Sequence, residues 1–269
     1  MLNALALAAF LPLSVTAAPV AAAAAPVDVR ADVEAPPVRR ELVSIPAGEH
    51  VPFYGGGGSE QIAAFELDRH PVTQHDFLEF VEQNPQWRRS AIRPVFADEG
   101  YLRGWLAPLE PADPAAPVVG VSWFAARAFC GWVGARLPTT AEWEYVAAAS
   151  ESLRDASRVD EFRTRVLELY TRARPDRLAP AGSGMRNWYG IHDLHGFVRE
   201  WVADFNNVMV SDDSRATGGS NRQLYCAAAA STARDPSDYP AFLRYSFRAS
   251  LNARSTHTNL GFRCARSVS

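Results

Sequence analysis

The polar residues of segment 190–204, GIHDLHGFVREWVAD, have types and a spacing that suit a metal ion. Asp193 and Glu200 supply two carboxylates seven residues apart, and the glycine between them permits a tight reversal of the chain. The backbone carbonyls of Gly196 and Val198 can point the same way as both carboxylates. Because Ca²⁺ takes about six to eight oxygen ligands, often carboxylates mixed with carbonyls on an irregular loop, these four residues predict a calcium site.

Two other interpretations of this segment remain open at the level of sequence. His192 and His195 offer imidazole ligands for a softer metal ion. Alternatively, the segment is a turn in which the Asp193 carboxylate accepts backbone hydrogen bonds while Trp201 packs below it.

The three cysteines, Cys130, Cys226 and Cys264, are an odd number. In an oxidising compartment two of them would pair and one would remain, but this arithmetic does not say which one. Cys226 lies between a glycine turn and a run of small residues, in GGSNRQLYCAAAAS (218–231). It is therefore a candidate reactive thiol, a candidate metal ligand, or a buried apolar residue.

The composition is that of a soluble globular protein, with 48% hydrophobic and 21% charged residues. The net charge is −3 and no long run of Lys or Arg occurs, so nucleic acid is not an expected partner. The chain has no HExxH, CxxC, Walker, dinucleotide-binding or GxSxG motif, so the classes that these motifs define are not indicated.

The N-terminal region predicts export to the periplasm or secretion. Residues 1–25 hold a short apolar stretch followed by small residues, which is typical of a signal peptide, although no Lys or Arg precedes the apolar stretch. The apolar stretch is shorter than the roughly 20 residues that span a bilayer, so no integral membrane segment is expected after cleavage. Residues 26–40 are an Ala/Pro linker, and 41–269 form the expected folded domain.

Short elements must position the candidate residues. A strand is expected at 65–68, followed by a helix that Thr73 caps. Two apolar helices are expected around a proline turn, the second beginning with the capping box Thr139–Glu142. Residues 159–170 have the spacing of an amphipathic surface helix. The proline-rich region 84–117 predicts irregular structure, and the chain from Pro175 onward is expected to be rich in loops.

Several stretches, taken in order, resemble the formylglycine-generating enzyme and sulfatase-modifying factor family. They are IPAGEH, FELDRHPVTQHDFLEFV, VVGVSWFAARAFCGWVGARLPTTAEWEYVAA, GIHDLHGFVREWVAD, GGS and NLGFRCAR, and they cover most of 43–266. The resemblance implies an α+β fold that is related to C-type lectins and rich in irregular structure.

The resemblance also implies roles for named residues. The family binds structural Ca²⁺ at the positions of Asp193, Gly196, Val198 and Glu200, and the resemblance therefore favours the calcium interpretation of this segment. The family's second calcium loop would fall within 150–186, where this chain has the amphipathic helix, so that site is expected to be absent. Members of the eukaryotic type link the positions of Cys130 and Cys264 by a disulfide.

The family's copper site is not reproduced in this chain. Active members hold copper(I) with two cysteines, the first three residues after the serine of GGS and the second five residues further on. Here Gln223 stands three residues after Ser220, Cys226 stands six residues after it, and no further cysteine follows before Cys264. Because copper(I) prefers two soft ligands, Cys226 would need a partner such as His257 or His195.

Two functions therefore compete. In the first, the protein is a metal-dependent oxidative tailoring or maturation enzyme acting on a protein or peptide, with Cys226 and His257 as catalytic residues. Ser220 and Asn259 would then line its substrate groove, as the resemblance implies. In the second, it is a non-catalytic binding or accessory protein on the same scaffold, for example for an exported copper enzyme.

Overall fold

The computed structural model describes residues 40–54, 58–173, 175–196, 198–206, 233 and 235–268. All of them belong to one compact unit, Ala35–Ser269. Two predicted site residues, Ser220 and Cys226, lie outside the described residues, as do the predicted signal peptide and all of the predicted linker except Arg40.

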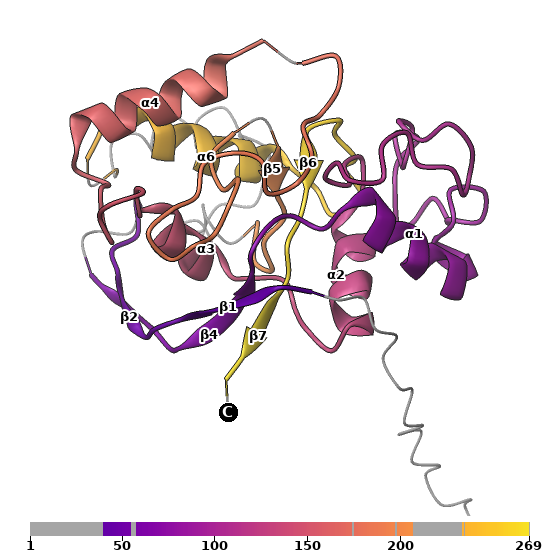
Figure 1. Ribbon diagram of the computed structural model, residues 1–269, viewed down its shortest axis with the longest axis horizontal. Coiled ribbons are helices and arrows are strands. Elements are labelled where there is room, and N and C mark those ends of the chain that lie inside the picture. The colour runs from indigo at the N-terminus through magenta and orange to yellow at the C-terminus, as the bar shows by residue number, and fades with distance from the viewer. Residues whose placement is uncertain are drawn as a thin grey trace, which may run out of the picture. The chain divides into compact units, whose positions relative to one another are not determined.

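A small antiparallel sheet ties the start of the folded unit to its end. Its strand order is β1 (Leu42–Ile45), β4 (Phe65–Asp68), β7 (Ala265–Ser267). Leu67 of the central strand is fully buried and pairs with Val43 on one side and Ala265 on the other. The expected strand at 65–68 is confirmed, and Figure 1 shows the yellow C-terminal strand beside the indigo N-terminal strands.

Two further strand pairs complete the described sheet structure. One is the antiparallel hairpin of β2 (Gly48–His50) and β3 (Glu60–Ile62), and the other is the short parallel pair of β5 (Arg199–Glu200) and β6 (Leu260–Gly261). The parallel pair matters for the site, because it joins the segment with the candidate carboxylates to the segment with Asn259.

The first three helices follow the sequence predictions closely. They are α1 (Gln74–Gln83), α2 (Trp123–Trp132) and α3 (Thr140–Ala147). Thr73 caps α1 and Thr139 caps α3, each with a reciprocal capping box. Both hydroxyls and both partner carboxylates satisfy amides that the first helical turn leaves free. Between α1 and α2 the chain has only the short 3₁₀ helix η1 (Pro85–Trp87) and turns, which confirms the irregular region.

Two longer helices pack side by side and cover α3. These are α4 (Asp160–Thr171), at the expected place, and α6 (Tyr239–Ser250), which appear together at the top of Figure 1. The prediction of a loop-rich end is wrong for α6. Its start signals are present in the sequence, because Asp238 accepts a hydrogen bond from the amide of Ala241 and Pro240 stands in the first turn.

The core is made of aromatic and aliphatic side chains from the sheets, the helices and the segments between them. Phe77, Phe80, Phe129 and Phe262 pack against one another with ring centroids 5.3 to 6.1 Å apart. Within the part of the chain that the structure describes, no helix has the length and apolar character needed to cross a membrane.

Candidate functional site

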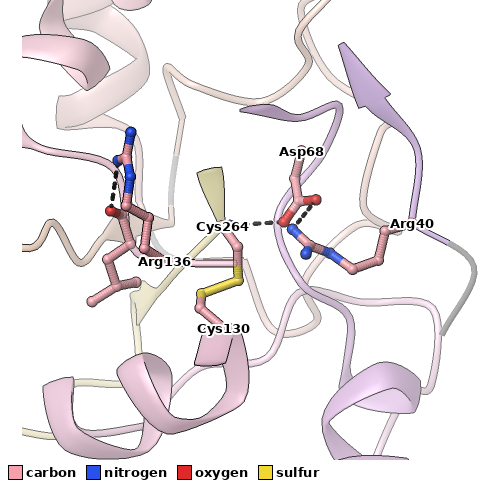
Figure 2. Close-up of a disulfide and its surroundings, with 6 residues drawn as sticks. Arg40, Asp68, Cys130, Arg136 and Cys264 are labelled. Atoms are coloured by element: carbon pink, nitrogen blue, oxygen red, sulfur yellow. Dashed lines mark hydrogen bonds and ion pairs between the residues drawn. A yellow bond between two sulfur atoms is a disulfide. The ribbon is translucent and has the colours of Figure 1, made fainter. Parts of the chain in front are cut away.

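Cys130 and Cys264 form a disulfide, as the family resemblance implies. Cys130 lies on α2 and Cys264 immediately precedes β7, with a Cα–Cα distance of 5.6 Å and no exposure of either residue. Figure 2 shows the bond and, beside it, the Asp68 carboxylate, which accepts a 2.7 Å hydrogen bond from the Cys264 amide and pairs with Arg40. Because the chain has three cysteines, this bond leaves only Cys226.

Asp193 uses its carboxylate within the protein. Its backbone has φ of 62°, and its two carboxylate oxygens accept hydrogen bonds from the amides of Gly182 at 2.5 Å and Gly184 at 2.7 Å. This is the arrangement of the turn interpretation, in which Asp193 stabilises a reversal of the chain.

Glu200 also has its own protein partners. Its two oxygens accept hydrogen bonds from Arg263 Nε and Nη2, both at 2.8 Å, and one of them also accepts from Trp143 Nε1 at 2.8 Å. The Glu200 and Arg263 side chains are at most 1% exposed, so this is a buried, bidentate ion pair.

Both carboxylates of the predicted calcium site therefore already have partners within the protein. One is paired with a guanidinium and the other accepts from backbone amides, so a calcium ion would compete with these partners for the carboxylate oxygens. Among the described residues, no three His, Cys, Asp or Glu side chains gather as a metal-binding group. Calcium binding stays a prediction, and the function proposed below does not depend on it.

His195 is a structural residue in this fold. Its Nε2 lies 2.7 Å from the Ala147 carbonyl, and its Nδ1 lies 3.0 Å from the Tyr170 hydroxyl. Because a carbonyl only accepts, Nε2 carries the proton and Nδ1 accepts from Tyr170. Burial, together with the positive charge of Arg244, lowers the pKa of His195 to about 3. With both nitrogens engaged, His195 is not available as a ligand to copper or to the softer metal considered above.

We expect His195 to make stability depend on pH below neutrality. Its pKa is about 3 in the folded protein and near its ordinary value of 6.5 in the unfolded chain, so its contribution is complete above pH 6.5 and declines as the pH falls. Between pH 6.5 and 5, the free energy of unfolding should fall more steeply in wild type than in His195→Gln, by up to about 1.4 kcal/mol per pH unit. Urea unfolding at stepped pH measures both slopes, and parallel slopes would contradict this prediction.

The structure brings His257 and Asn259 close to Arg199. The Asn259 carbonyl accepts a 2.7 Å hydrogen bond from the Arg199 amide across the β5–β6 pair. The ring of Phe247 on α6 lies 5.9 Å from that of His257 and 5.6 Å from the Arg199 guanidinium carbon. Two of the predicted site residues thus converge on one region.

A buried charge cluster connects this region to α3. Glu144 accepts hydrogen bonds from Arg244 Nε and Nη2, at 3.0 and 2.7 Å, and from Arg248 Nη1 at 2.5 Å. Burial alone would raise the pKa of Glu144, but the two guanidiniums outweigh it and lower the pKa to about 2. These arginines are not among the residues predicted from the sequence, because α6 lies where loops were expected, although their i, i+4 spacing beside Tyr245 could have indicated a polar helix face.

Two cavities border the charge cluster, and Arg244 lines both. The larger has a volume of about 680 Å³ and lies between α4, α6 and the segment after β2. Its lining combines rings with charged groups, among them His50, Phe53, Arg163, Arg244 and Tyr245. The smaller, of about 10 Å³, is lined by Trp143, Tyr170, Arg199, Phe247 and Arg248 among others. The larger cavity has a volume that suits binding of a ligand or a peptide segment.

Comparison with known proteins assigns the scaffold. Residues 31–268 match the model of the sulfatase-modifying factor enzyme 1-like domain. The chain therefore belongs to the formylglycine-generating enzyme and sulfatase-modifying factor family, which confirms the α+β fold expected from sequence.

Individual relatives differ in how much of their length this chain matches. It is 28% identical over 255 residues to the serine/threonine-protein kinase pkn1 of Chlamydia caviae, covering 88% of this chain but only 40% of that protein. It is 30% identical over 246 residues to inactive C-alpha-formylglycine-generating enzyme 2 of Bos taurus, covering 76% of this chain and 77% of that protein. The crystal structure of CarF aligns with a TM-score of 0.48 and 15% identity, covering 86% of this chain and 99% of that one.

Proposed function

We propose that this protein is a non-catalytic binding or accessory protein on the formylglycine-generating enzyme scaffold, with a peptide or protein as its partner. The observation that carries the proposal is the buried Cys130–Cys264 disulfide, which leaves one thiol in a chain of three cysteines. A copper site of the family's kind needs two thiolates, and a single thiolate holds copper(I) poorly without a second soft ligand.

The surroundings of the histidines support this proposal. His195 has both ring nitrogens engaged by protein groups and is buried. Of the two histidines considered as partners for Cys226, only His257 remains. The bovine relative that matches over three quarters of both chains bears the name of an inactive enzyme, which is consistent with the loss of chemistry on a retained scaffold.

The proposed place of action is an exported compartment. A buried disulfide persists in the periplasm or outside the cell, where thiols are oxidised. The apolar N-terminal stretch of the sequence supports the same location. A partner in that compartment, for example an exported copper enzyme, meets this protein without a membrane between them.

Copper(I) titration tests the proposal. The protein keeps its disulfide, Cys226 stays reduced, and a chromophoric copper(I) chelator competes for the metal. We expect wild type and Cys226→Ala to leave all copper with the chelator, because one thiolate without a soft partner does not compete with it. His257→Ala is the matched variant at the remaining candidate ligand. One copper(I) retained per wild-type chain, and released by either substitution, would favour the oxidative enzyme instead.

A further inference from the structure

The guanidinium of Arg199 lies beside two aromatic rings. Its guanidinium carbon lies 3.8 Å from the centroid of the Tyr170 ring, with the Phe247 ring 5.6 Å away. These ring contacts orient the planar group and do not themselves engage its N–H donors. Among the residues that the structure describes, the buried Nη1 atom of Arg199 has no hydrogen-bond partner. A buried donor of this kind is costly unless an acceptor reaches it.

The surroundings of Arg199 carry more positive than negative charge. Arg199, Arg244, Arg248 and Glu200 all line the small cavity, and Arg263 is paired with Glu200. Glu144 is shared by Arg244 and Arg248. Among the described residues, these four guanidiniums accompany the carboxylates of Glu144 and Glu200, with Asp238 as a third negative charge that acts on Arg244, so positive charge is in excess.

The pKa of Arg199 is consistent with this imbalance. Burial, with repulsion from Arg244 and Arg248, lowers the pKa of its guanidinium from the ordinary value. The nearby Asp238 acts on Arg244 from the start of α6, where it caps the helix and lines the larger cavity. It is not among the residues that line the small cavity.

We propose that Arg199, with Arg244 and Arg248 beside it, binds a carboxylate of the peptide partner. This inference rests on the proposed binding function and names the chemistry that the partner must present. The small cavity, of about 10 Å³, has room for about one water-sized group, so one carboxylate oxygen can enter it. A carboxylate oxygen accepts a strong, charge-assisted hydrogen bond from a guanidinium N–H such as Nη1.

The residues around the cavity are arranged for such a contact. Among its lining residues, Trp143 and Glu200 are buried, while Tyr170, Arg199 and Phe247 are only half-buried. A carboxylate that enters beside the half-buried residues would reach Nη1 of Arg199 and place its charge beside Arg244 and Arg248. The charge of Glu200 is already balanced by Arg263.

The test is a titration with N-acetylglycine, a small model of a peptide C-terminus. Binding is monitored by NMR spectroscopy through the Nε–H signals of the arginines. N-acetylglycinamide, which lacks the charge, and sodium chloride at equal ionic strength are the control titrants. We expect Arg199→Gln to weaken N-acetylglycine binding by at least about tenfold, because a charge-assisted hydrogen bond is lost. Arg199→Lys should retain part of the affinity, since it keeps the charge.

Arg127→Gln is the matched control variant, because Arg127 is exposed and also stacks on a ring, that of Trp123. It should bind N-acetylglycine as wild type does. No binding to wild type, equal binding of the amide, or unchanged affinity in Arg199→Gln would each overturn the carboxylate proposal. The copper titration is independent of these outcomes. If neither N-acetylglycine nor copper binds, only the carboxylate inference is wrong. If copper binds tightly, the proposed function itself is wrong.

Discussion

Replacing Cys130 and Cys264 together by alanine is expected to lower the free energy of unfolding by about 5 kcal/mol. The bond joins residues separated by 134 positions, and in the chain-entropy model a loop of that length constrains the unfolded chain by about this amount. Both residues are fully buried beside the central strand of the sheet, so their loss also removes core contacts. Guanidinium unfolding of the variant and the wild type measures the difference.

Cys226→Ala is the matched control for that double substitution, since it removes a cysteine without removing the bond. It should change the free energy of unfolding by less than about 1 kcal/mol. If the double alanine variant were as stable as wild type, the bond would contribute nothing to the fold, and the expectation would be wrong.

Removing one partner of the Glu200–Arg263 pair is expected to lower the free energy of unfolding almost as much as removing the disulfide. Glu200→Gln leaves the Arg263 guanidinium, which has no exposed side-chain surface, without its counter-charge. An unpaired buried charge costs about 3–5 kcal/mol. Arg263 also donates to the carbonyls of Asp68 and His192, so its displacement would loosen β4 and the turn that leads to Asp193.

This substitution also separates the ion-pair account from the calcium prediction. Glu200→Gln should lose the same stability in excess calcium and in a chelator, because the loss comes from the Arg263 guanidinium left without its counter-charge. Glu151→Gln is the comparison variant, since Glu151 pairs with Arg165 on the surface. This substitution should lower the free energy of unfolding by less than about 1 kcal/mol. If calcium raised the free energy of unfolding of the wild type by several kcal/mol, and did not do so for Glu200→Gln, the predicted calcium site would be supported and the ion-pair account contradicted.

The local elements were predictable because their signals are local. The caps at Thr73 and Thr139 lie within four residues of the groups that they satisfy, and the structure confirms both helices. The disulfide came from the family resemblance, since its partners stand 134 positions apart and spacing alone left the pairing open.

The candidate site was harder to predict, because its carboxylates are satisfied by distant groups. Glu200 meets Arg263 across 63 positions, and Glu144 meets Arg248 across 104. A sequence shows that Glu200 could bind calcium, but it does not show that a guanidinium already neutralises it. Likewise, Arg199 is an ordinary charged residue in sequence, and only the structure shows that it lies against Tyr170 and Phe247 with its Nη1 atom lacking a hydrogen-bond partner among the described residues.

The proposed function requires Cys226 to be the one free thiol of this chain, so that no two-cysteine copper site can form. Alkylation of the exported protein under denaturing, non-reducing conditions, followed by peptide mapping, tests it most directly. We expect one alkylated cysteine per chain, at Cys226, and a linked peptide that contains Cys130 and Cys264. Alkylation at Cys130 or Cys264, or a disulfide that includes Cys226, would contradict the account.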